Sequence, residues 1–94
     1  MNKVYLVYVH SCDGNVANET FEASVCDSLA TAEKHLANIV KDFESEILPT
    51  YNEGEYTISR ASTYFWFSTE CEDNNYYHVF IQDREVITHE CFNQ

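Results

Sequence analysis

Glycine, proline and basic side chains are all scarce in this chain of 94 residues. Only two Gly and one Pro occur, which excludes collagen-like and low-complexity sequences. Five Lys and Arg residues stand against sixteen Asp and Glu residues, so the formal net charge is −11 at pH 7. Direct binding to a nucleic-acid backbone or to an anionic lipid surface needs clustered cations. The charge therefore argues against both of these ligand classes.

Long apolar runs are also missing. No stretch approaches the roughly 18 apolar residues that a membrane-spanning helix needs. The short apolar run after Lys3 is followed by the turn residues Ser-Cys-Asp-Gly at 11–14, and not by the small-residue cleavage site of a secretory signal. We therefore expect a soluble cytoplasmic protein. Reduced thiols are then expected at the four cysteines, which include no C-x-x-C pair: Cys12, Cys26, Cys71 and Cys91.

The overall composition is that of a single globular domain spanning residues 1–94. Hydrophobic residues make up 45% of the chain and charged residues 22%, whereas disordered chains combine low hydrophobicity with high net charge. Segments rich in β-branched and aromatic residues predict strands over Lys3–Cys12, Thr20–Cys26, Glu55–Thr69 and Tyr76–Ile87. The third segment is long for one strand, and a break near residues 60–62 stays open.

One amphipathic helix is predicted between the second and third strands. Ser28 is a favourable N-cap, because its hydroxyl can accept a hydrogen bond from an unpaired amide of the first turn. Apolar residues then recur at spacings of three and four from Leu29 to Ile47, and Pro49 ends the helix near Leu48. The order β-β-α-β-β predicts an α+β fold, in which the helix packs on one face of an antiparallel sheet of about four strands.

The predicted strands carry apolar or aromatic residues on both sides. An antiparallel sheet with one solvated face should alternate apolar with polar residues, yet Tyr64 and Trp66 alternate with Phe65 and Phe67. A single helix covers only one face. Two interpretations of the second face stay open: partial cover by the long loop and the C-terminal tail, or a docked partner, which includes a second copy of the chain.

Acidic residues gather at two places. One group lies in the last turns of the predicted helix, where carboxylates oppose the helix macrodipole at roughly 0.3–1 kcal/mol each when exposed. The other lies at a hairpin tip within residues 70–75. Either both are a solvated surface that favours solubility, or they form a patch for a basic partner. The candidate partner-binding residues are Asp42, Glu44, Glu46, Glu70, Glu72 and Asp73, with Trp66 from the aromatic sheet face.

A repeated His-x-Cys pattern is the one arrangement that suggests a metal. It occurs as His10 with Cys12 and as His89 with Cys91. Residues two apart on a strand point the same way, so two such strands side by side would supply the four ligands of a tetrahedral zinc site. The spacing matches no usual zinc pattern, and Cys26 is expected under the helix. Unligated side chains are therefore the default, and zinc is the alternative.

Catalytic and cofactor motifs are not found. A nucleophilic pair of Cys71 with His78 is disfavoured, because the carboxylates beside Cys71 would raise the pKa of its thiol. Two isolated glycines cannot form a phosphate-cradling loop. We expect a protein that is not an enzyme and that holds no cofactor.

Two short motifs carry a resemblance to known proteins. The run Lys-Val-Tyr-Leu-Val at 3–7, and the step Ser-Val-Cys-Asp-Ser at 24–28 that leads into Ala-Glu-Lys at 32–34, resemble a diffuse group of small proteins from phages and bacterial mobile elements. An aromatic residue is usual in that group where Cys26 stands. The resemblance implies a β-β-α-β layout and no catalytic residues. Size, charge and layout are also similar to those of acidic anti-CRISPR inhibitors that mimic DNA.

Three functions follow as hypotheses. The first is a non-enzymatic binding protein, in bacterial or phage-host cytoplasm, that occludes a basic nucleic-acid-binding surface of a host protein. The second is a structural homo-oligomer, such as a homodimer, that pairs its second sheet face with itself. The third is the small metal-binding protein described above.

Overall fold

The structure is a computed structural model, which describes residues 3–13, 19–69 and 75–86. In chain order its elements are β1 (Lys3–Asp13), β2 (Thr20–Cys26), α1 (Leu29–Glu46), the short 3₁₀ helix η2 (Leu48–Thr50), β3 (Tyr56–Ala61), β4 (Tyr64–Thr69) and β5 (Asn75–Glu85). β2 has the bounds predicted from the sequence. The ends of β1, α1 and β5 differ from the prediction by one or two residues.

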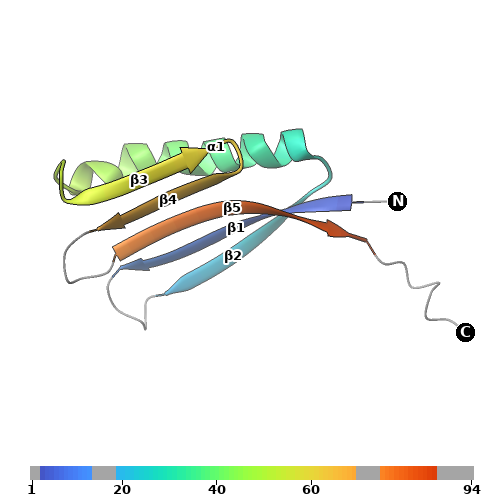
Figure 1. The fold of residues 1–94 in the computed structure, drawn as a ribbon, viewed down its shortest axis with the longest axis horizontal. Helices are drawn as coiled ribbons and strands as arrows, with labels where there is room; N and C mark the ends of the chain where they lie inside the picture. The colour runs from blue at the N-terminus through green and yellow to red at the C-terminus, as the bar shows by residue number, and fades with distance from the viewer. Residues whose placement is uncertain (1–2, 14–18, 70–74, 87–94) are drawn as a thin grey trace, which may run out of the picture.

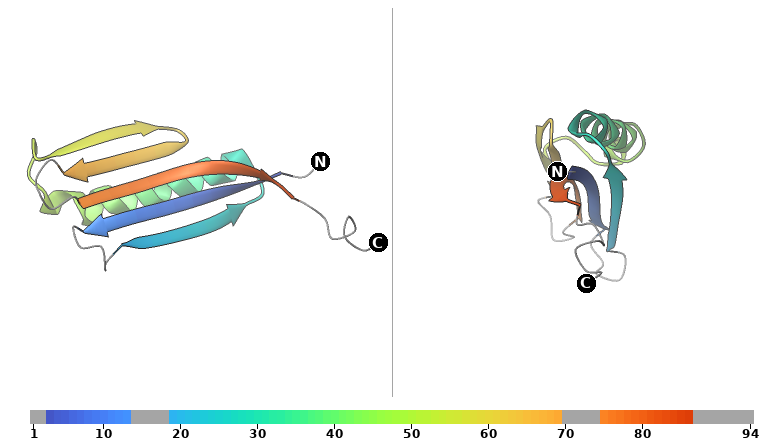
Figure 2. Two further views of the ribbon diagram at one scale, coloured as in Figure 1. Left: turned by 60° about the horizontal axis from the view of Figure 1, so that its bottom comes forward. Right: turned by 90° about the vertical axis from the view of Figure 1, so that its right-hand side faces the viewer.

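All five of these strands pair antiparallel in one sheet, in the order β2-β1-β5-β4-β3. The two long strands β1 and β5 pair along their whole lengths, which places the first and last strands side by side inside the sheet. α1 runs along the sheet, and the end-on view in Figure 2 shows that it lies on one side only (Figures 1 and 2). The fold is therefore α+β, with one helix on one face of an antiparallel sheet, as predicted.

The prediction of about four strands in the order β-β-α-β-β is wrong. The segment Glu55–Thr69, in which a break near residues 60–62 stayed open, is the hairpin of β3 and β4. In it, Ala61 pairs with Tyr64 across the two turn residues Ser62 and Thr63. Neither turn residue is a Gly, Asn or Asp, the residues that two-residue hairpin turns favour most strongly. Tyr and Phe continue directly after the turn, so the strand signal resumes at once. The order in the structure is β-β-α-β-β-β.

The residues at the two ends of α1 explain where the helix begins and where it ends. Ser28 is extended, with φ −144° and ψ 156°, and its hydroxyl accepts a hydrogen bond from the amide of Thr31 at 3.1 Å. The helix ends at Glu46, and the chain continues into η2, which holds Pro49. Pro49 has no amide hydrogen to continue the helix and disfavours helical geometry at the residue before it. No helix within the described residues is long and apolar enough to cross a membrane.

The cap at Ser28 gives a first prediction. Replacing Ser28 by Ala is expected to lower the free energy of unfolding by about 1 kcal/mol, since one amide of the first turn loses its acceptor. Urea unfolding measures the change. Ser45→Ala is the matched control, because that exposed hydroxyl only donates to the carbonyl of Asp42 within the helix. Equal losses in both variants would contradict the capping role.

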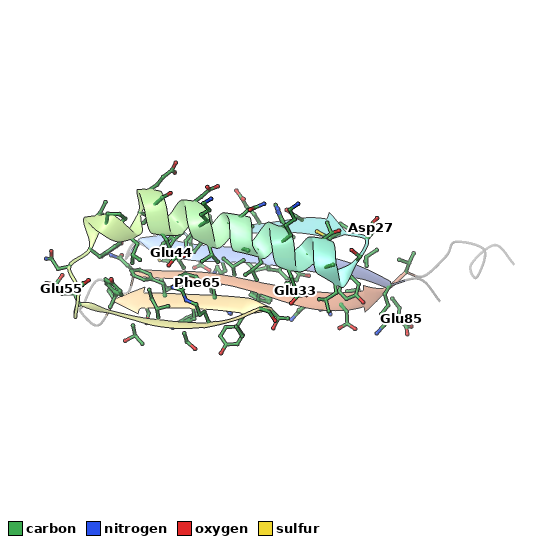
Figure 3. All side chains as sticks on the ribbon, turned by 90° about the horizontal axis from the view of Figure 1, so that it is seen from above. Asp27, Glu33, Glu44, Glu55, Phe65 and Glu85 are labelled. Carbon is green, nitrogen blue, oxygen red and sulfur yellow. The ribbon has the colours of Figure 1, made fainter. Side chains whose placement is uncertain are left out.

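The core lies between α1 and the sheet. Ring contacts hold it together: Phe43 of α1 lies 5.5 Å from Phe65, 5.0 Å from Phe67 and 4.4 Å from Tyr77, measured between ring centroids. Figure 3 shows Phe65 on the strand beneath the helix. Cys26 is buried in the same layer, as predicted. The buried residues are Val7, Cys26, Ala32, Leu36, Val40, Phe43, Phe65, Phe67 and Val79.

Candidate functional site

The sheet has a helix side, which α1 covers, and an open face on the other side. Side chains alternate between the two along each strand, and the register places one set together. No helix or strand within the described residues covers the open face (Figure 2). Its main side chains are Val4, Leu6, Tyr8, His10 and Cys12 of β1, Phe21 and Val25 of β2, Tyr76, His78, Phe80, Gln82 and Arg84 of β5, and Tyr64 and Trp66 of β4.

Seven rings on the open face contact one another in a closed circuit. Going round it, the rings are Tyr8, Phe21, His10, Tyr76, Trp66, His78 and Phe80, and then Tyr8 again, with neighbouring centroids between 4.6 and 6.0 Å apart. The circuit joins four strands. Part of it is exposed, since Phe21 keeps 58% of its surface in solvent and nearby Val25 keeps 68%. An exposed apolar surface that extends over several strands is typical of an interaction site.

The described carboxylates of the strands lie away from this face. Glu22, Asp83 and Glu85 are the acidic residues with described side chains in the strands, and the register places all three on the helix side. The hydrogen bond from Lys3 to Asp83, at 3.0 Å, holds the pKa of that carboxyl below its usual value. Among the described side chains, charges on the open face lie at its two ends, where Glu19 pairs with His10 at one end and Arg84 lies at the other.

The helix side carries the acidic surface. Asp42 and Glu46 are exposed near the end of α1, and its last turn holds no basic residue. Glu53 and Glu55 follow in the exposed loop after η2. Within the described residues no ion pair engages any of these four carboxylates. They form what we call the acidic helix end: Asp42, Glu46, Glu53 and Glu55.

Glu44 has a different role from its acidic neighbours. Its carboxylate accepts a hydrogen bond from the Arg60 guanidinium at 2.8 Å, and Arg60 also lies 5.3 Å from the ring centroid of Phe65. Figure 3 shows Glu44 on the flank of α1 that faces the strand of Phe65. A groove of about 380 Å³ between the helix and this hairpin is lined in part by Glu33 and Arg60. Glu44 therefore ties α1 to β3.

The candidate partner-binding residues are divided between the two sides. Asp42, Glu44 and Glu46 lie on the helix side, whereas Trp66 lies in the ring circuit of the open face. The structure does not bring Trp66 together with the acids. The remaining candidates at the hairpin tip lie outside the described residues: Glu70, Glu72 and Asp73.

The candidate metal ligands are only partly described. His10 and Cys12 share the open face, while His89 and Cys91, like Cys71, lie outside the described residues. The His10 ring contacts Glu19 and the hydroxyl of Tyr76. Among the described side chains, no three His, Cys, Asp or Glu residues gather closely enough to hold a metal ion.

His78 makes the open face sensitive to pH. Its pKa is lowered from the ordinary 6.5, first by burial and then by His10, its cross-strand partner. The unfolded chain therefore binds a proton at a pH where the folded chain does not. Above the pKa of His78 in the unfolded chain, this group does not reduce the free energy of unfolding. As the pH falls from that value toward the lower pKa of His78 in the folded chain, the free energy of unfolding decreases.

A urea series at pH values from about 7.5 to 5.5 tests this effect. We expect the free energy of unfolding to fall across the series in the natural chain, and to fall less in His78→Phe. His10, the titratable neighbour that acts on the pKa of His78, is unchanged in that variant. The same slope in both proteins would show that His78 is not responsible.

No protein-family model, no curated protein and no solved structure matches this chain.

Proposed function

We propose that this chain is a non-enzymatic protein-binding module, whose acidic side occludes a basic nucleic-acid-binding surface of a host protein in the manner of an anti-CRISPR inhibitor. One observation carries the proposal, which is the separation of charge between the two sides of the sheet. The strand carboxylates lie on the helix side with the acidic helix end. The net charge of the chain is −11, and the described carboxylates contribute to it unevenly on the two sides of the sheet.

The position of the acids supports a binding role over a purely structural one. Carboxylates at a helix C-terminus are unfavourable by roughly 0.3–1 kcal/mol each. Asp42 and Glu46 gain no ion pair within the described residues that would offset this. A basic partner would supply the missing counter-charges, and long-range attraction would steer it to this side.

The choice of a basic groove as target follows from charge and size. Surfaces that bind nucleic acid present clustered Lys and Arg, which are the groups that the acidic helix end would attract. A small acidic protein bound to such a basic surface occupies the site of the phosphate backbone and so excludes the nucleic acid. Such a mechanism is steric and electrostatic, and it needs no catalytic residue or cofactor.

A salt-controlled capture experiment tests the proposal. The chain is immobilised on a solid support and incubated with a bacterial lysate at about 0.05 M and at about 0.5 M salt. The retained proteins are identified by mass spectrometry. We expect a stoichiometric, basic nucleic-acid-binding protein at low salt that is released at high salt. An empty bait, or a partner held equally at both salt concentrations, would contradict it.

A further inference from the structure

The open face is the surface that the proposed function leaves unused, and we propose that it pairs two copies of this chain face to face about a twofold axis. This inference does not rest on the proposed function, because it concerns the opposite side of the sheet. The proposed occupant of the open face is a second copy of this chain. Three features of the face support this occupant: its area, its lack of charge, and the positions of the charges at its two ends.

The size of the face suits a stable dimer. Strands lie about 4.8 Å apart and rise about 3.4 Å per residue. Five strands, of which β1 and β5 have 11 residues each, therefore form a face of roughly 700–900 Å². Stable interfaces bury about 800 Å² on each partner. Interface cores are rich in aromatic residues and poor in charge, as is the ring circuit.

Neutrality argues for a copy of the chain over the basic partner. A basic surface would find no strand carboxylate to pair with among the described side chains of the open face. A second copy presents another neutral aromatic surface. In the pair, both acidic helix sides point outward, and at physiological salt charges beyond about 8 Å are largely screened. The described strand carboxylates and the acidic helix end of each chain are thus kept away from the contact.

The end charges fit a twofold pairing. Tyr8 and Phe80 are cross-strand partners near the middle of the face, with Arg84 toward one end and Glu19 toward the other. Consider a twofold axis that lies between the two faces, at their middle, and runs perpendicular to the strands. It brings the Arg84 end of each copy over the Glu19 end of its partner. Each contact then occurs twice, as an isologous interface requires.

Trp66 gives a direct spectroscopic readout, because it is the only tryptophan of the chain and lies in the ring circuit. Sedimentation equilibrium and Trp66 emission are measured over a dilution series from about 0.5 mM downward. We expect twice the chain mass of 10.9 kDa at high concentration, and a red shift of emission as the dimer dissociates. A single-chain mass throughout the series would overturn the proposal, whether Trp66 is exposed or covered by another part of the same chain.

Tyr64→Glu and Asn38→Glu are the matched variants. Both positions are exposed and both variants add one negative charge, but Tyr64 lies on the open face and Asn38 on α1. We expect Tyr64→Glu to raise the dimer dissociation constant on the order of 100-fold, because each dimer would bury two added charges. Asn38→Glu should leave it within about threefold, since the added charge stays in solvent. Equal effects would contradict the assignment of the open face.

A charge swap at the two ends of the face tests the orientation and replaces none of the seven ring residues, although Glu19→Arg removes the contact of Glu19 with the His10 ring. Arg84→Glu alone should weaken the dimer, and the double variant Arg84→Glu with Glu19→Arg should recover most of the loss, because the end charges are again opposite across the axis. Circular dichroism confirms that each variant is folded. A double variant weaker than the single one would overturn the twofold arrangement.

Discussion

Replacing Phe43 by Ala is expected to lower the free energy of unfolding by about 3–5 kcal/mol, the range for aromatic truncations in a core. Phe43 is 2% exposed and contacts the rings of Phe65, Phe67 and Tyr77. It is therefore the point at which α1 joins β4 and β5. Domains of this kind are stable by only about 5–15 kcal/mol, so we expect a much lower urea midpoint.

The matched control is Phe21→Ala, the same chemical change on the open face. Phe21 is 58% exposed, so its truncation removes little buried surface and should lower the free energy of unfolding by less than about 1 kcal/mol. Both variants are compared at a concentration where the chain is monomeric. Equal losses of unfolding free energy in the two variants would contradict the assignment of the core to the helix side of the sheet, where Phe43 is buried.

Reversing two charges of the acidic helix end is expected to weaken binding to the captured partner. Asp42→Lys with Glu46→Lys should raise the dissociation constant on the order of 10–100-fold at low salt and flatten its salt dependence, because steering and counter-charge are lost together. Glu44 is left unchanged, since its carboxylate pairs with Arg60 inside the fold. Calorimetry over a salt series measures both quantities.

The control for charge reversal lies at the far end of the molecule. Asp27 and Glu85 are exposed carboxylates at the end opposite the loop of Glu55, as Figure 3 shows. Asp27→Lys with Glu85→Lys changes the net charge by the same amount as reversal at Asp42 and Glu46. A similar loss of affinity in both double variants would mean that net charge, rather than the acidic helix end, governs binding.

Local signals in the sequence predicted most of the fold. The bounds of β2, the N-cap at Ser28 and the position of Cys26 under the helix were predicted correctly, because each depends on residues close in sequence. The turn at Ser62 and Thr63 was only left open as a break near residues 60–62, because neither residue is one of the Gly, Asn or Asp residues that favour a two-residue hairpin turn. The pairing of β1 with β5 joins residues that are between 62 positions apart, at Asp13 and Asn75, and 82 positions apart, at Lys3 and Glu85, and no local pattern specifies it.

The candidate site was predicted less completely than the fold. Excess acid at the end of α1 is plain in the sequence, but the engagement of Glu44 by Arg60 depends on where β3 packs. Trp66 was grouped with the acids although it lies on the other side of the sheet. Apolar residues on both sides of the predicted strands indicated a second apolar surface. Only the register shows that its rings form one circuit and that the strand carboxylates lie opposite.

A competition experiment tests most directly whether the acidic side of the chain excludes nucleic acid from its partner. The chain is titrated into a complex of the captured partner with a fluorescently labelled nucleic acid, and anisotropy is followed. We predict that anisotropy falls to the value of the free nucleic acid, and that Asp42→Lys with Glu46→Lys largely abolishes this displacement. A rise in anisotropy, which reports a ternary complex, would contradict occlusion.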